Sequence, residues 1–413
     1  MECRKEINNC EDIMIMKKKP AVSKMTLISI ASIPLVMTLG NSMLIPVLPI
    51  IEKKIHISSV QASMMITCYS IASILLIPIA GFLSDKYGRK KIILPSLLIV
   101  MIGGLISGIA SSKMDDPYIT IIMGRLLQGI GAAGAAPIVL PLVGDLYKKD
   151  EDASAALGVI ETSNTFGKVL SPIFGALLAS FVWFLPFYVI SILSAISFVL
   201  ICFFVKISRK PKTVKVKDFL SNTKQIFKNE GRWLYTLFLA GGYVMFILFA
   251  IQVFLSNSLE SDFNLHGVKK GFVLAIPLLL LCIASLVSSK VIKGSKSMMK
   301  NVILLGLTLQ VISLLFFKEF SSIFPLVLVS SLNGIAIGMI LPSLDALVTE
   351  NIEKSQRGMI TSFFSSARFI GVALGPLVMS VIQNKHMTSP KYIAAILSIT
   401  LLVMVWKQIQ VDD

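Results

Sequence analysis

Five charged residues inside long apolar runs are the ones in this sequence that could do chemistry: Arg125, Glu161, Lys168, Asp345 and Arg368. A charged side chain at the centre of a bilayer costs about 2.5 kcal/mol or more, so such residues face other protein groups and often mark a path for ions or substrate. Burial disfavours the charged form of a carboxylate. Glu161 is therefore predicted to carry a proton.

The cations among these residues suggest a second task, which is anion binding. Arg125 lies about six residues, or roughly 9 Å, from the outer end of its predicted helix. Lys168 lies about 22 Å from the inner end of its own helix, at residue 153, so both reach a similar depth. Two cations at one level can hold an anionic substrate or bracket a carboxylate, although a structural pairing role is the alternative for Arg125. Asp345 is predicted to cap its helix or pair with a cation, and Arg368 to lie near mid-depth. The surplus of one positive charge favours anionic substrates.

Further polar or aromatic side chains interrupt the same runs: Tyr69, Asn164, Tyr243, Gln252 and Asn333. The first three are predicted to line a substrate cavity with the two mid-depth cations, Lys168 and Arg368. Ordinary packing against neighbouring helices or lipid is the alternative for most of them.

The elements that must position these residues are membrane-spanning helices. The 413 residues are 55% hydrophobic and only 15% charged, against about 25% charged in soluble domains. About 20 apolar residues are needed to cross a bilayer core as a helix. Twelve such runs are predicted, at 27–50, 59–83, 92–111, 118–145, 153–180, 183–205, 233–256, 269–289, 301–318, 322–348, 357–382 and 391–406. The fold class is therefore all-α, with twelve transmembrane helices.

The distribution of positive charge predicts the orientation of these helices. Of the 39 Lys and Arg residues, 28 fall in the tails and loops on the side of both termini and 8 in the loops on the other side. Loops rich in Lys and Arg stay in the cytoplasm. Both termini are thus predicted to be cytoplasmic, in a multi-pass protein of the cell membrane.

A basic polar stretch at 206–232 divides the chain into two halves of six helices. The predicted units are a tail at 1–26, a bundle at 27–205, the basic cytoplasmic linker at 206–232, a second bundle at 233–406 and a tail at 407–413. Within the linker, VKDFLSNTKQIF spaces its apolar residues along one helical face, which suits a helix lying on the inner leaflet. A merely solvated linker is the alternative.

An internal repeat relates the two halves. GKVLSP (167–172) aligns with GVALGP (371–376), and GIGAAGAAPIVLP (129–141) with GIAIGMILP (334–342). Two related six-helix bundles in parallel repeat are the layout of carriers that expose a midplane cavity to one side of the membrane at a time.

The sequence contains few residues arranged for metal, redox or nucleophilic chemistry. The five cysteines are scattered without C-x-x-C or metal-type spacing, and the three histidines lie in predicted loops. We therefore predict no metal, no cofactor and no enzyme activity. Because topology accounts for the positive charge, no nucleic-acid partner is predicted either.

Two motifs carry a resemblance to a known family. GFLSDKYGRKK (81–91) has glycine, aspartate, glycine and basic residues in the order of the loop between helices 2 and 3 of the major facilitator superfamily, and RLLQGIGAA (125–133) is similar to its helix 4 signature. The chain resembles the twelve-helix drug:proton antiporter branch of this family. The runs TLISIASIPLVMTLGNSMLIPVLPIIEKK and SSARFIGVALGP look like Gram-positive exporters that include those of the siderophore bacillibactin.

The resemblance implies roles for several motif residues. In the loop motif, Gly81, Asp85, Gly88 and Arg89 are implied to form a gate latch, with the aspartate docking at the start of helix 11. The matching arginine of the family, here Arg125, is implicated in proton coupling. Membrane anchoring is the alternative for the basic residues of the loop.

Two further motifs concern helix geometry. GKVLSPIFGA (167–176) resembles the helix 5 signature of exporters, although Ser171 and Ala176 replace two glycines. The implied hinge positions are Gly167, Pro172, Gly175, Gly371, Gly375 and Pro376. NSMLIPVLP (41–49) resembles the helix 1 signature, and its two prolines are predicted to kink or loosen that helix beside the cavity.

The function implied is proton-coupled export of a small amphiphilic molecule, either a drug or a siderophore. A proton symporter that imports a sugar or organic acid is the alternative. The predicted partners are the small-molecule substrate, protons and the lipid bilayer, with the chain acting as a monomer.

Overall fold

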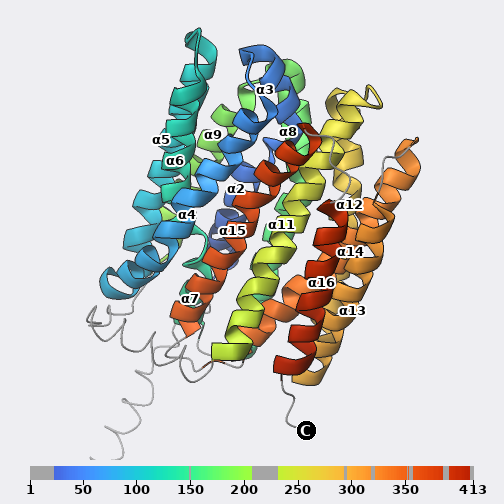
Figure 1. Cartoon of the computed structure of the whole chain (residues 1–413). Helices are drawn as coiled ribbons and strands as arrows, with labels where there is room; N and C mark the ends of the chain where they lie inside the picture. Colours follow the sequence, from blue (N-terminus) through green and yellow to red (C-terminus); the bar gives the residue numbers. More distant parts are fainter. Residues whose placement is uncertain are drawn as a thin grey trace, which may run out of the picture.

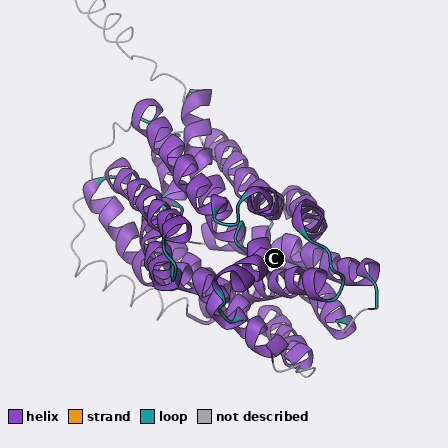
Figure 2. Ribbon diagram, turned by 90° about the horizontal axis from the view of Figure 1, so that it is seen from above, coloured by secondary structure: helices purple, strands orange, loops and turns teal. Residues whose placement is uncertain are grey.

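The computed structural model describes residues 23–147, 150–206, 231–292, 295–317, 321–350, 352, 357–384 and 390–409. These residues form helices joined by short turns, without a strand among them (Figure 2). The predicted tail at 1–26, except for its last four residues, and the inner part of the predicted linker lie outside the described residues.

The first half of the chain, which we call the N-half, contains the helices that precede the linker. They are α2 (Lys24–Ser42), η1 (Ile45–Val47), α3 (Leu48–Ile55), α4 (Ser59–Tyr87), α5 (Arg89–Lys113), α6 (Tyr118–Ala135), α7 (Val139–Leu146), α8 (Asp150–Phe181) and α9 (Leu185–Phe204). Local signals set several starts. Ser58, for example, forms a capping box with Gln61 at the start of α4.

In the second half, the C-half, the described residues form six helices. They are α11 (Gly231–Ser261), α12 (Gly267–Ile292), α13 (Lys296–Phe316), α14 (Ile323–Glu350), α15 (Arg357–Asn384) and α16 (Pro390–Gln408). Eleven spans of the described residues are long and apolar enough to cross a membrane, counting α2 to α3 as one span and α6 with α7 as another. The twelfth predicted helix is α8, which has 32 residues but is less apolar because it carries buried polar side chains.

Helix 1 is broken where its two prolines predict a break. The α-helix α2 stops at Ser42, a short 3-10 turn carries Pro46, and α3 then starts beside Pro49. A proline has no N–H to donate to the carbonyl four residues earlier. Pro49 therefore leaves the carbonyl of Ile45 without its α-helical donor, and this carbonyl accepts a hydrogen bond from Ser256 of α11 at 3.1 Å.

The two halves meet mainly along two helix pairs, α4 with α15 and α8 with α12, and η1 also contacts α11 and α12. Figure 1 shows α15 running beside both α4 and α11. The largest core cluster lies mainly among α11 to α16, and a second lies among the N-half helices. Large apolar side chains such as Leu75, Phe203 and Phe324 are exposed on the outside, as expected for a surface that faces lipid.

Glycine contacts show that the sequence repeat is also a structural repeat. A Cβ at Gly129 of α6 would lie 2.1 Å from the carbonyl oxygen of Tyr69 in α4, and one at Gly334 of α14 would lie 2.2 Å from that of Pro277 in α12. Only glycine permits such close approach of two helix backbones. The corresponding helices of the two halves therefore pack in the same way.

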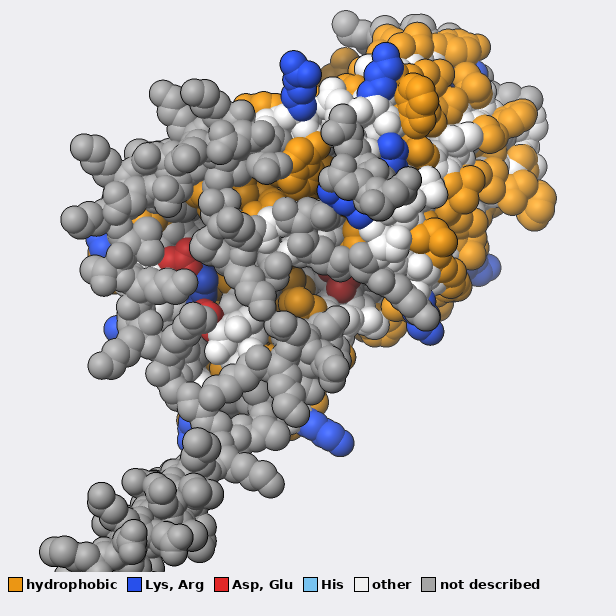
Figure 3. Space-filling model, turned by 90° about the horizontal axis from the view of Figure 1, so that it is seen from below, with side chains coloured by type: hydrophobic (Ala, Val, Ile, Leu, Met, Phe, Trp, Pro, Cys, Tyr) orange, Lys and Arg blue, Asp and Glu red, His pale blue; other side chains and the backbone are white. Residues whose placement is uncertain are grey.

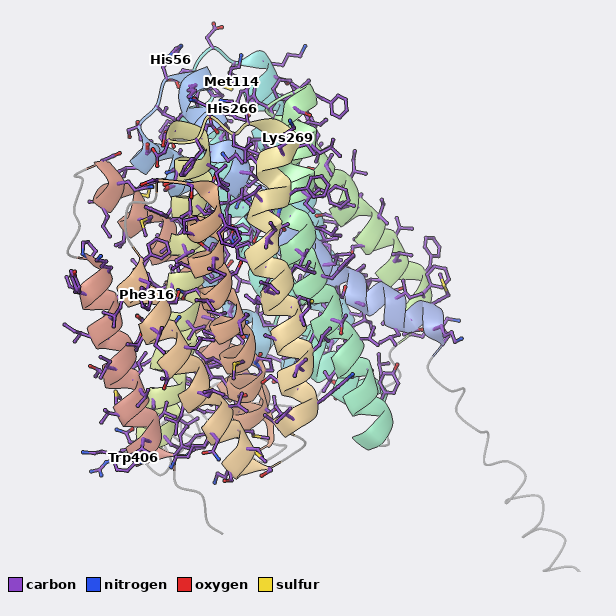
Figure 4. The ribbon with its side chains drawn as sticks, turned by 90° about the vertical axis from the view of Figure 1, so that its right-hand side faces the viewer. His56, Met114, His266, Lys269, Phe316 and Trp406 are labelled. Carbon is purple, nitrogen blue, oxygen red and sulfur yellow. The ribbon has the colours of Figure 1, made fainter. Side chains whose placement is uncertain are left out.

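The molecule has two ends that differ in charge and in contacts. Figure 4 places His56, Met114, His266 and Lys269 at one end, which we call the opposite end, and Trp406, close to the C-terminus, at the other, the terminal end. Figure 3 views the terminal end and shows Lys and Arg side chains around that face, with apolar side chains along the flank of the molecule.

Candidate functional site: a central charge cluster between two halves

Four of the five predicted charges come together where the halves meet. Glu161 and Lys168 of α8 interact electrostatically with each other and with Asp345 of α14 and Arg368 of α15. We call these four residues the central charge cluster. It combines two acids and two bases, so it is neutral when all four are charged, and it draws on both halves of the chain.

Within the cluster, Arg368 and Asp345 form a direct ion pair. The Nη1 atom of Arg368 donates to both carboxylate oxygens of Asp345, at 3.0 and 3.3 Å. This confirms the prediction that Asp345 pairs with a cation. The pair joins α14 to α15 inside the C-half, and both side chains keep partial exposure.

Glu161 is held by neutral groups instead of by an ion pair. Asn164 donates its amide to Glu161 Oε1 at 3.3 Å, and the Thr165 hydroxyl lies 3.4 Å from the same oxygen. Thr38 of α2 in turn donates to the amide oxygen of Asn164 at 2.6 Å. Within the described part of the chain, no cation lies within ion-pair distance of Glu161, so its carboxylate is available to change partners.

Lys168 lies at a small cavity between the halves. The cavity has a volume of about 20 Å³, room for roughly one water molecule. Its lining comprises Ser42, Ile45, Lys168 and Pro172 of the N-half with Leu248, Phe249, Gln252 and Leu278 of the C-half. The Lys168 side chain is buried, and the walls of the cavity are otherwise mostly apolar.

Arg125 lies in a separate network inside the N-half. Its guanidinium is fully buried and donates four hydrogen bonds of 2.5 to 3.1 Å. The acceptors are the backbone carbonyls of Gly40 and Met65 and the side-chain oxygens of Asn41 and Gln128. The ring of Tyr69 lies 4.6 Å from its Cζ atom. Although Arg125 and Lys168 were predicted at one depth, the structure does not bring them into one site.

The remaining predicted cavity residues are divided between the cluster and other contacts. Asn164 belongs to the surroundings of Glu161, and Tyr69 to those of Arg125. Tyr243 lies elsewhere, because its hydroxyl donates to the carbonyl of Ala394 at 2.5 Å and contacts Ser398, both on α16. Tyr243 thus connects two helices within the C-half.

The loop motif forms a compact ion network at the terminal end. Arg89 is paired with Asp85, and its Nε atom lies 3.3 Å from Asp145 of α7. Gly88 has φ +103°, a conformation that L side chains rarely adopt, so this turn needs glycine. A Cβ at Gly81 would lie 2.7 Å from the hydroxyl of Ser362 on α15, so this glycine lets α4 approach the other half.

The helix 5 and helix 11 motifs pack against the first helix of their own half. A Cβ at Gly175 would lie 2.1 Å from the carbonyl oxygen of Met43, and one at Gly371 would lie 1.9 Å from that of Gly242. Gly167 and Gly375 make similar but looser approaches to α2 and α11. These glycines allow close helix packing; a hinge role for them and for Pro172 and Pro376 stays a prediction.

A second ion network, at the opposite end, was not anticipated from the sequence. Glu260 of α11 accepts hydrogen bonds from Lys270 of α12 at 2.8 Å and from Lys53 of α3 at 2.9 Å. By sequence, Glu260 falls in a loop and Lys270 counts among loop charges, yet both are buried in the structure. Both residues lie just inside the ends of their helices, and this position was the only indication that the sequence offered. Their pairing can be recognised only in the folded structure.

Among the described residues, no group of three or more His, Cys, Asp or Glu side chains is arranged to hold a metal ion. The central charge cluster and its surroundings contain charged and hydrogen-bonding groups of the chain. Such an arrangement can bind a charged ligand and can take up or release protons.

Comparison with known proteins places this geometry in a family. The family described as Major Facilitator Superfamily matches residues 30–300 and 253–411. The chain belongs to the Major Facilitator Superfamily. The bacillibactin exporter of Bacillus subtilis (strain 168) is 50% identical to this chain over 360 residues, which are 87% of this chain and 90% of that protein. The resemblance predicted from the loop and helix 4 motifs is thereby confirmed.

Two more distant matches also cover nearly the whole chain. Multidrug resistance protein 2 of Bacillus subtilis (strain 168) is 26% identical over 412 residues, covering 95% of this chain and 98% of that protein. The crystal structure of the human organic anion transporter MFSD10 (TETRAN) superposes with a TM-score of 0.70 at 18% identity, over 92% of this chain and 99% of that one. The chain is thus a multi-pass membrane transporter with the fold of this superfamily.

Proposed function

We propose that this chain exports a small, anionic, amphiphilic molecule from the cell in exchange for protons. The observation that carries the proposal is the central charge cluster, which draws on both halves and includes Lys168 at the cavity between them. A cluster with members on both sides of a moving interface can sense which way the carrier faces. The identity to an exporter supports the outward direction of transport.

The proposed substrate is a catecholate siderophore such as bacillibactin. The support is the 50% identity to a protein named for bacillibactin export, together with a buried lysine in a mostly apolar cavity, a setting that favours an anion with apolar parts. General multidrug efflux is the second candidate, favoured by the similarity to multidrug resistance protein 2.

In the proposed cycle, Glu161 carries the proton and Lys168 the substrate. Exchange requires that substrate and proton occupy the site in turn. The substrate therefore binds while Glu161 is charged. After the substrate leaves outward, Glu161 takes up a proton, carries it inward and releases it before the next substrate binds.

The proposed orientation places both termini in the cytoplasm and the protein in the cell membrane as a monomer. Its support is the excess of Lys and Arg on the terminal side. The opposite end would then face outward. The gate role of Asp85 and Arg89 belongs to the same proposal and would act at the cytoplasmic face.

The test is transport of catecholate into inverted membrane vesicles, with the wild type, Glu161→Gln and Lys168→Ala compared. We expect a proton gradient to drive transport in the wild type, Glu161→Gln to uncouple transport from that gradient, and Lys168→Ala to reduce transport of anions more than of cationic dyes. Lys290→Gln, an exposed lysine at the end of α12, is the matched control. Transport that persists after collapse of the proton gradient would refute proton exchange.

Substrate identity needs its own experiment. In iron-limited cells that lack the gene, we expect less catecholate in the medium and more inside the cells. Unchanged secretion combined with increased sensitivity to dyes would favour multidrug efflux, whereas accumulation of a sugar or organic acid by the wild type would favour the import alternative.

A further inference from the structure

The ion network at the opposite end connects the two halves of the transporter. Lys53 is part of α3 in the N-half, and its Nζ atom lies 2.9 Å from Glu260 Oε1 in the C-half. Lys270 Nζ of the C-half lies 2.8 Å from Glu260 Oε2 and donates to the carbonyl of Pro46 in the N-half at 3.1 Å. Each of the two bonds that reach the N-half must break when the halves separate at this end.

The acceptors in the N-half come from the break in helix 1. The Pro46 carbonyl accepts from Lys270, and the carbonyl of Ile45, which lacks its α-helical donor because of Pro49, accepts from Ser256 of α11. The Ile45 carbonyl also accepts the N–H of Leu48 within the 3-10 turn. The break in helix 1 thus presents main-chain acceptors to the C-half at the place where the halves close.

Close backbone packing surrounds the same contact. A Cβ at Gly271, next to Lys270, would lie 2.6 Å from the carbonyl oxygen of Pro172 in α8 and 2.8 Å from Ala176 Cβ. Ala176 is one of the positions where this chain departs from the glycine of the helix 5 signature. Gly271 supplies the missing space from the facing helix, so the two halves remain in tight contact at this end.

Two of the three charges are almost fully withdrawn from solvent. The side chains of Lys270 and Glu260 are 2% and 6% exposed, whereas that of Lys53 is 69% exposed. A buried charge is tolerated only while it is paired, and removing one partner is strongly destabilising. Glu52 of α3 and His266 also face this network, at its rim.

We infer that Glu260 and Lys270 are gate residues, which hold the opposite end of the carrier closed through Lys53 and the Pro46 carbonyl of helix 1. This inference rests on the proposed alternating exposure of the central cavity. When this end opens, Glu260 and Lys270 keep each other, since both belong to the C-half, and they release Lys53 and Pro46. The closed state is the one that satisfies all of these groups.

The test measures access to the cavity from outside the cell. A cysteine is introduced by Ser42→Cys, which lies in the cavity lining, in a background whose native cysteines are replaced. Its labelling by a membrane-impermeant maleimide is followed in intact cells. We expect Glu260→Gln to raise the labelling rate by about tenfold or more, because the closed state then buries Lys270 without its carboxylate.

Two controls separate a gate from a general loss of structure. The double variant Glu260→Gln with Lys270→Met removes both charges, and its labelling should return toward the parent rate. Lys53→Glu should raise labelling because it places a like charge beside Glu260, whereas Lys54→Glu, at the exposed neighbouring position, should not. These exposed positions keep the test valid if Glu260→Gln does not fold.

The outcomes distinguish this inference from the proposed function. Labelling that is unchanged in both Glu260→Gln and Lys53→Glu, or raised equally by Lys54→Glu, would overturn the gate assignment even if catecholate export is established. Conversely, labelling that follows the expected order would support the gate even if the vesicle assay shows another substrate or no proton exchange, because the readout requires neither.

Discussion

Arg125 and the central charge cluster are both buried charge sites in the same membrane protein, yet they are built on opposite principles. Arg125 is surrounded by neutral acceptors, all from the N-half, and its ring contact with Tyr69 completes its surroundings. The cluster consists of charged groups from both halves, and only Arg368 and Asp345 are in direct contact. The two sites therefore differ in whether their contacts cross between the halves, although both bury charge.

The difference lies in what happens to each site when the halves move. In the proposed cycle, the acceptors of Arg125 move with it because they belong to the same half, and its hydrogen bonds are kept. The distances from Glu161 and Lys168 to the charges of the C-half change as the halves move. We therefore propose the central charge cluster as the site that converts a change of protonation into a change of conformation.

The largest expected effect that tests this comparison is loss of folding stability in Arg125→Ala. Removing the guanidinium breaks four buried hydrogen bonds, and each buried acceptor that is left without a donor costs about 1–3 kcal/mol. We expect a destabilisation on the order of 3 kcal/mol or more, measured as a lowered unfolding temperature of the purified protein in detergent. Arg125→Lys should recover part of the loss. A variant that unfolds normally but no longer couples to protons would instead assign Arg125 to coupling, as the family resemblance implies.

A smaller stability effect but a larger transport effect is expected at the ion pair of the cluster. Arg368→Gln and Asp345→Asn each remove a charge from a partly exposed pair, worth about 1 kcal/mol or less to folding. Each should nevertheless impair proton-driven efflux, because the cluster is no longer neutral. The double variant restores neutrality, so its efflux should exceed that of either single variant. If the double variant is no better than the worse single variant, the charge balance of the cluster does not matter.

The helices and their order were predictable from the sequence because hydropathy is a local property. All twelve predicted spans overlap helices whose ends differ by a few residues, and the break at Pro46 and Pro49 was expected from proline chemistry. The exception in hydropathy was α8, which is less apolar because it carries Glu161 and Lys168. The residues that weaken its signal as a membrane span are the ones that make it part of the site.

The pairing of charges was not predictable in the same way, because it depends on which helix faces align in three dimensions. Depth along a helix suggested that Arg125 and Lys168 share a level, but depth contains no information about direction around the helix axis. Glu260 and Lys270 were missed for a related reason. Each lies near a helix end, where a charge is ordinarily solvated, and only the packing of α11, α12 and helix 1 buries them.

The smallest expected effect concerns Thr38, whose hydrogen bond to Asn164 supports the surroundings of Glu161. Its hydroxyl donates to Asn164, and Asn164 donates to Glu161, so a neutral hydrogen-bond chain inside the N-half orients a member of the cluster. Thr38→Val keeps the shape and removes the donor, at a cost of about 1 kcal/mol in stability. We expect proton-driven efflux to fall a few fold while substrate binding is kept, since Asn164 loses its fixed orientation toward the carboxylate. Thr400→Val, on an exposed stretch of α16 where the hydroxyl bonds only to its own helix backbone, is the matched control and should leave efflux unchanged. Equal effects of the two substitutions would mean that Glu161 functions without the hydrogen bonds from Thr38 and Asn164, so that the N-half contributes only the carboxylate.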